Sequence, residues 1–200
     1  MDARRAPQGP AGTLAQVTSL PRTNTLWWAL PTAATLGVLA LTSIGLQPQV
    51  LPALYLAAVT PTLCATDVVD RRLPNAVVLP GYLAAAAGML GTWATTGGPP
   101  LISLATGTTY FVLLYVLAIA GGMGMGDVKL AGVLGLTAGL LGPTAALVAP
   151  AAAFVLGGAA AVVGARRGAT TSIPFGPFLL AGFWIAVTTA SGLSPGGSST

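Results

Sequence analysis

Residues Gly121–Leu130 read GGMGMGDVKL and place one carboxylate, Asp127, behind a run of glycines, with hydrophobic segments on both sides. A second acidic stretch, TDVVDRRLPN, occupies Thr66–Asn75. The chain of 200 residues contains only four acidic side chains, and three of them fall in these two stretches. Because a carboxylate beside hydrocarbon is costly, an acid inside or at the edge of a membrane is a candidate for function.

The composition is that of an integral membrane protein. Hydrophobic residues make up 54% of the chain and charged residues 6%, whereas a soluble domain has about 25% charged residues. The length fits a single membrane domain. With no His and one Cys, the chain has no internal disulfide or cysteine zinc site, and we expect neither a metal nor a cofactor.

Hydropathy predicts an all-α, polytopic transmembrane helix bundle of about seven spans. A hydrocarbon core of about 30 Å needs about 20 helical residues. The fifth segment has about 13 apolar residues and reaches only ~20 Å, so six full spans are the alternative. The predicted segments are approximately 26–46, 50–66, 76–95, 101–120, 130–141, 143–165 and 178–193.

The basic residues suggest the topology. Placing the N-terminus in the cytoplasm puts every Lys and Arg beside a span on the cytoplasmic side, and the opposite loops carry none, as the positive-inside rule requires. This distribution explains the net charge of +4 better than nucleic-acid binding does. We expect a flexible cytoplasmic tail over residues 1–25, a membrane-embedded domain over 26–193 and a disordered tail over 194–200.

This topology brings two acids to one membrane edge. Asp67 ends one outward-to-inward span and Asp127 follows another, so a small bundle can bring them together. Two adjacent carboxylates do not both ionise easily, and such a pair can activate water against an amide carbonyl. We further expect Gly122, Gly124 and Gly126 to allow close approach of a substrate backbone and positive φ angles.

Simpler interpretations of these stretches remain open. The glycine run is compatible with a flexible loop. It matches neither a dinucleotide fingerprint nor a P-loop. Asp70 beside Arg71 and Arg72 is typical of a surface ion pair, which contributes little to stability, and Lys129 is typical of a topology determinant.

Together the two stretches resemble the type IV prepilin peptidase family, a group of GxGD membrane aspartic proteases. The family pattern has an aspartate about seven residues before a Leu-Pro-Asn/Asp, followed later by GxGD and Lys-Leu. Here Asp67 precedes Leu73-Pro74-Asn75, and the later motif is GMGDVKL. The run IPFGPFLLAG, Ile173–Gly182, also resembles a segment near the end of that family.

The resemblance implies an aspartic endopeptidase in the bacterial inner membrane. Its substrate would be a prepilin or pseudopilin with a hydrophobic N-terminal helix, cleaved at the cytoplasmic face. Larger family members carry paired CxxC motifs and also N-methylate the product, so this chain resembles a peptidase-only form. The implied catalytic residues are Asp67 and Asp127, and the supporting residues are Pro74, Asn75, Gly124, Gly126 and Lys129.

Two other functions are compatible with the residues alone. The first is a small transporter that uses Asp67 and Asp127 as proton or cation sites. The position of the acids at one edge and the lack of an internal repeat argue against it. The second is a structural subunit of a pilus or secretion assembly, in which the acids contact partner proteins.

Overall fold

The computed structural model describes residues 26–121, 123–167 and 174–190, and every regular element in these ranges is an α-helix. The predicted all-helical bundle is confirmed. The two predicted tails, 1–25 and 194–200, lie outside the described residues. The helices are α1 (Leu26–Ile44), α2 (Val50–Asp70), α3 (Asn75–Thr96), α4 (Leu101–Ile119), α5 (Met125–Leu141), α6 (Pro143–Arg166) and α7 (Gly176–Ala190).

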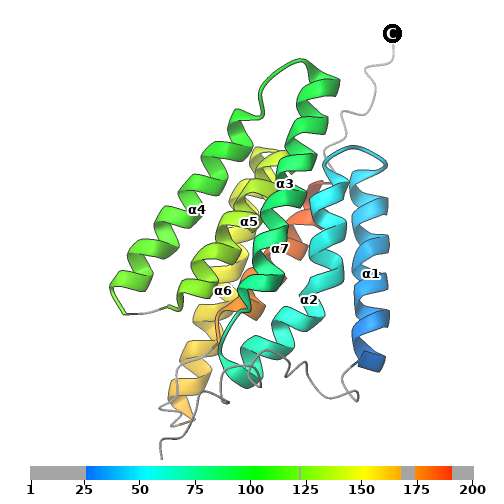
Figure 1. Ribbon diagram of the computed structural model, residues 1–200. Helices are drawn as coiled ribbons and strands as arrows, with labels where there is room; N and C mark the ends of the chain where they lie inside the picture. Colours follow the sequence, from blue (N-terminus) through cyan, green and yellow to red (C-terminus); the bar gives the residue numbers. More distant parts are fainter. Residues whose placement is uncertain (1–25, 122, 168–173, 191–200) are drawn as a thin grey trace, which may run out of the picture.

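Five helices, α1, α2, α3, α4 and α6, are long and apolar enough to cross a membrane, so this is a multi-pass membrane protein. The two shorter helices, α5 and α7, lie in the middle of the bundle (Figure 1). α5 packs against α3, α4, α6 and α7, while α7 packs against α1, α2, α5 and α6. A short helix surrounded by protein need not match the thickness of the lipid, which accounts for the short fifth segment in the sequence.

Two helix boundaries beside the acids differ from the sequence prediction. α2 continues to Asp70, so Asp67 lies inside a helix rather than at the start of a loop. α5 begins at Met125, so Asp127 lies in its first turn. Gly126 is therefore helical, and Gly124 has φ −80° and ψ 149°. The expectation of positive φ at these two glycines was wrong, whereas Gly121 does have φ +84°. Gly122 lies outside the described residues.

Glycines allow the central helices to approach their neighbours closely. A Cβ built on Gly139 of α5 would lie 2.5 Å from the Cα atom of Ser103 in α4. A Cβ on Gly182 of α7 would overlap the carbonyl oxygen of Ala149 in α6. Lipid chains are as apolar as Leu, so close backbone packing of this kind is a main source of helix association in membranes.

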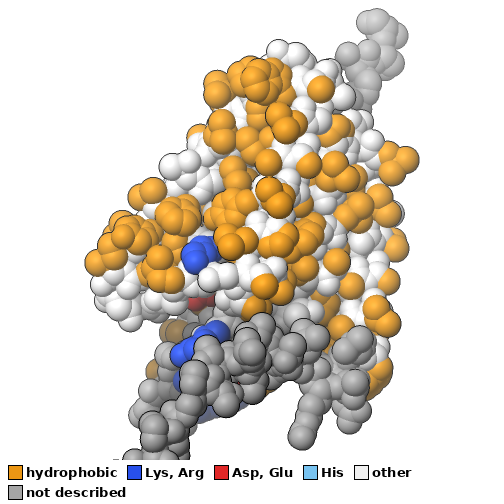
Figure 2. Space-filling model, in the orientation of Figure 1, with side chains coloured by type: hydrophobic (Ala, Val, Ile, Leu, Met, Phe, Trp, Pro, Cys, Tyr) orange, Lys and Arg blue, Asp and Glu red, His pale blue; other side chains and the backbone are white. Residues whose placement is uncertain are grey.

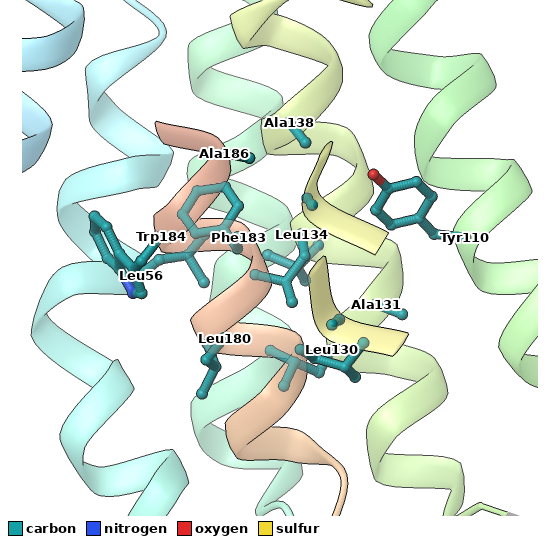
Figure 3. Packing of buried hydrophobic residues seen from close by; sticks show 14 of the residues in the cluster. Leu56, Tyr110, Leu130, Ala131, Leu134, Ala138, Leu180, Phe183, Trp184 and Ala186 are labelled. Atoms are coloured by element: carbon teal, nitrogen blue, oxygen red, sulfur yellow. The ribbon is translucent and has the colours of Figure 1, made fainter. Parts of the chain in front are cut away.

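The core is centred on α7, with α2 on one side and α5 on the other (Figure 3). Phe183 of α7 is fully buried there with leucines from all three helices. The indole N–H of Trp184 donates a hydrogen bond of 3.1 Å to the Thr60 hydroxyl, which ties α7 to α2. These contacts hold α7 against α2.

The connections α2–α3 and α4–α5 and the end of α6 lie at the same end of the bundle (Figure 1). Hydrophobic side chains are spread over the visible face of the described residues, and Figure 2 shows their charged atoms only in the lower half of the view, toward that end. The basic residues of the described chain therefore gather on one side, as predicted. The assignment of that side to the cytoplasm remains a prediction.

Candidate active site

Asp67 is held by the end of its own helix and by the start of α7. Its side chain is 5% exposed. Its backbone carbonyl accepts the Arg71 N–H at 3.0 Å, and Arg71 ends α2 in the left-handed region with φ 51°. Its carboxylate oxygen Oδ2 accepts the backbone N–H of Gly176 at 2.9 Å. Asp67 is thus a buried carboxylate with a fixed orientation.

Asp127 is held by the start of α5. Its backbone N–H donates to the Gly124 carbonyl at 3.1 Å, and its side chain is 8% exposed. Its Oδ1 atom is buried and accepts no hydrogen bond from the described residues. A Cβ on Gly124 would lie 3.7 Å from Oδ2, so the glycine that precedes the helix faces the other carboxylate oxygen.

The two carboxylates meet at Gly176. A Cβ built on Gly176 would lie 2.7 Å from Oδ2 of Asp67 and 3.6 Å from Oδ1 of Asp127. These two oxygens are therefore no farther apart than the sum of the two distances, and their charges interact. Helices α2, α5 and α7 bring together two acids that are far apart in the sequence, and only a residue without a side chain fits between them.

The Leu-Pro-Asn stretch joins the glycine motif through side-chain packing. A Cβ on Gly126 would lie 2.9 Å from Cβ of Leu73 and 3.4 Å from its backbone nitrogen. Leu73 is 8% exposed and belongs to the core cluster. Gly126 therefore makes room for Leu73, and this contact sets how closely the segment after α2 approaches α5.

A second link joins the start of α3 to α5. Pro74 precedes α3 with φ −68°, an angle that its ring fixes. Next to it, the Asn75 side-chain oxygen accepts a hydrogen bond of 3.0 Å from the Lys129 ammonium group. The Tyr82 hydroxyl donates to the Lys129 carbonyl at 2.9 Å. Lys129 thus has a defined contact in addition to the role in topology that the sequence suggests.

A cavity of about 290 Å³ lies at this junction. Both aspartates line it, together with Asn75, Lys129 and the two glycines of GMGD. Arg71 and Arg72 also line it, whereas Asp70 is exposed and does not. A larger hollow of about 720 Å³ on the outer face of α4 is lined by apolar and Thr side chains. It contains no ionisable group, and we place the candidate site in the smaller cavity.

The sequence pattern assigns no role to Gly176, although the run that contains it resembles a segment of the family. The residue carries no side chain, and its hydrogen bond joins positions 109 residues apart. The flanking prolines, Pro174 and Pro177, were the available signal, because they restrict the backbone on both sides. No group of three or more His, Cys, Asp or Glu side chains suited to a metal ion occurs in the described ranges.

Comparison with known proteins identifies the family. The model of the type IV leader peptidase family matches residues 54–162, more than half of the chain and a range that includes both Asp67 and Asp127. No curated protein and no solved structure matches the chain. The predicted resemblance is confirmed: this chain belongs to the type IV leader peptidase family, whose members are prepilin-type aspartic peptidases.

Proposed function

We propose that this protein removes the leader peptide of prepilin-like or pseudopilin-like substrates at the cytoplasmic face of the bacterial inner membrane. Asp67 and Asp127 are the catalytic pair. The observation that carries the proposal is the meeting of these two buried carboxylates on either side of Gly176, in a cavity at one end of the bundle. Family membership supports the reaction class.

The proposed chemistry uses one proton shared by two carboxylates. The ionised carboxylate takes a proton from water while the water oxygen bonds to the scissile carbonyl carbon, and the protonated carboxyl gives its proton to the carbonyl oxygen. The tetrahedral diol then loses the amine. The nitrogen receives the proton taken from water, the C–N bond breaks, and one hydroxyl proton returns to the second carboxylate. The dyad ends in its starting state.

The supporting residues shape the site in this proposal. Gly126 admits Leu73, and Lys129 binds Asn75. Both contacts hold the segment after α2 against α5, so they fix the distance between the helices that carry the acids. Pro74 sets the direction in which the chain enters α3. Gly124 leaves open the space beside Asp127.

The substrate class follows from where the cavity lies. It sits where the α2–α3 connection meets the start of α5, at the end of a bundle whose helices expose many large apolar side chains, as on the face seen in Figure 2. A substrate with a hydrophobic helix can keep that helix in the bilayer. The peptide bond at the helix end then reaches the dyad, and a polar leader stays in water.

The test uses purified protein in liposomes and two synthetic substrates with the same leader and cleavage region. One continues into a prepilin-like hydrophobic helix, and the other continues into a polar sequence of equal length. We expect a single cut between leader and helix in the first substrate and much slower cleavage of the second, measured by mass spectrometry. Absence of cleavage in both would refute the proposed function.

A further inference from the structure

The start of α7 is built around one hydrogen-bond donor. The first turn of a helix leaves N–H groups without partners inside the helix. In α7, Pro177 has no N–H group, and the N–H groups of Phe178 and Leu179 both donate to the Phe175 carbonyl, at 3.0 and 3.1 Å. The Gly176 N–H therefore donates its hydrogen bond outside α7, and the acceptor is Oδ2 of Asp67 in α2.

The position of this donor is fixed by an aromatic anchor on α6. A Cβ on Gly157 would lie 2.5 Å from the Phe175 ring, so the ring occupies the space that the glycine leaves. The ring centroid lies 5.4 Å from that of Phe154 and 6.2 Å from that of Phe178. The residue that precedes the donor is thus packed on α6 and α7, which limits the movement of the Gly176 N–H.

The two acids are therefore unequal. Asp67 receives an N–H bond and faces the start of α7, where the helix dipole favours negative charge. Oδ1 of Asp127, the oxygen nearest to Gly176, is buried and accepts no hydrogen bond from the described residues. A proton on that oxygen removes the cost of burying an unpaired anionic oxygen. Asp127 also lies in a first turn, where the Gly124 backbone N–H favours its ionised form, but its Oδ1 atom stays buried with no hydrogen-bond partner among the described residues.

We infer that Gly176 is a positioning residue that makes Asp67 the ionised base of the dyad and leaves Asp127 as the protonated acid. Its N–H holds the Asp67 carboxylate, and its missing side chain lets Asp127 come close. Asp67 then takes the proton of the attacking water as the C–O bond forms, and Asp127 donates its proton to the carbonyl oxygen. This assignment rests on the proposed function, since it divides the roles of that same pair.

Other titratable groups lie on the elements around Asp67. Cys64 lies on the same helix, and its thiol interacts electrostatically with the Asp67 carboxylate. The other ionisable side chains that line the cavity are Asp127 and Lys129 of α5 and the two arginines after α2, Arg71 and Arg72. Lys129 is bound to Asn75. Neither α1 nor α7 has an ionisable side chain, and α3 contributes only the tyrosine whose hydroxyl is bound to the Lys129 carbonyl.

The main test is Gly176→Ala, measured with the helix-containing substrate in liposomes. The added methyl must displace the Asp67 carboxylate, because its place lies 2.7 Å from Oδ2 and 3.1 Å from Cγ. A displacement near 1 Å can cost about 100-fold in rate, so we expect kcat to fall by about that factor with little change in KM. We also expect the acidic limb of the pH–activity profile to move to higher pH, because the base loses a bond that favours its ionised form.

The second variant, Phe175→Ala, removes the anchor without adding atoms to the site. It should move the acidic limb in the same direction with a smaller loss of kcat. It keeps the inference testable even if Gly176→Ala does not fold. Ile185→Ala, an exposed position on the same helix, is the matched control and should match the unmodified protein in both limbs.

The possible outcomes separate the two proposals. An unmodified protein that does not cleave would refute the proposed function. If the unmodified protein cleaves and both variants keep its kcat and its acidic limb, the inference about Gly176 fails while the proposed function stands. A shift confined to the alkaline limb would overturn the assignment, because it would make Asp67 the acid of the pair.

Discussion

Gly126→Val tests whether the Leu-Pro-Asn stretch is packed onto the glycine motif. The first atom of the new side chain would lie 2.9 Å from Cβ of Leu73. Non-bonded carbon atoms prefer a separation of about 3.5–4.0 Å, so Leu73 must retreat by roughly 1 Å. The nearest atom is the root of a side chain and the next is backbone nitrogen at 3.4 Å, so rotation of a flexible end cannot relieve the contact.

This overpacking should cost about 1–3 kcal/mol of stability. Because the displaced segment follows the helix that carries Asp67, activity should fall as well, by about 100-fold for a displacement of that size. The assay compares thermal midpoints and specific activities of purified proteins in one detergent. Gly158→Val is the control, since a Cβ at this exposed α6 position has nothing within 4 Å. If Gly126→Val keeps both the midpoint and the activity of the unmodified protein, the packing argument is wrong.

Three further changes test other parts of the site. Asn75→Ala removes the acceptor of the Lys129 ammonium group. In a peptide-cleavage assay kcat/KM should fall about tenfold, which corresponds to about 1.4 kcal/mol of activation free energy. Unchanged kinetics would show that this contact does not contribute to the reaction. Asp70→Asn should keep full activity in the same assay, because the side chain is exposed and outside the cavity. Loss of cleavage would mean that Asp70 takes part in the reaction. Reporter fusions after Arg72 should indicate the cytoplasm and those after Gly97 the opposite side, and the same side for both would contradict the topology.

The number and order of the helices could be predicted from hydropathy, since a polypeptide in lipid must satisfy its backbone groups within each helix. The helix ends could not. α2 continues past Thr66 to Asp70, and the residue that caps it is Arg71 with φ 51°, where glycine is the usual signal. α5 starts within the glycine run because close packing on Leu73 outweighs the low helix propensity of Gly126.

The meeting of the two acids could be predicted in outline, because the positive-inside rule places both at one edge. The contribution of α7 could not. It depends on a backbone N–H of Gly176 and on the fit of the Phe175 ring over Gly157. Pro174 and Pro177 mark a restricted backbone around Gly176, but no local pattern shows which helix its N–H reaches or which glycine the Phe175 ring covers.

The most direct test of the central claim is leader cleavage by Asp67→Asn and Asp127→Asn. Asparagine keeps the size of each side chain but cannot exchange a proton in the dyad. The account predicts that each variant inserts and keeps a thermal midpoint near that of the unmodified protein, yet releases no leader from the helix-containing substrate in liposomes. Cleavage at the unmodified rate by either variant would contradict the claim that these two carboxylates carry out the reaction.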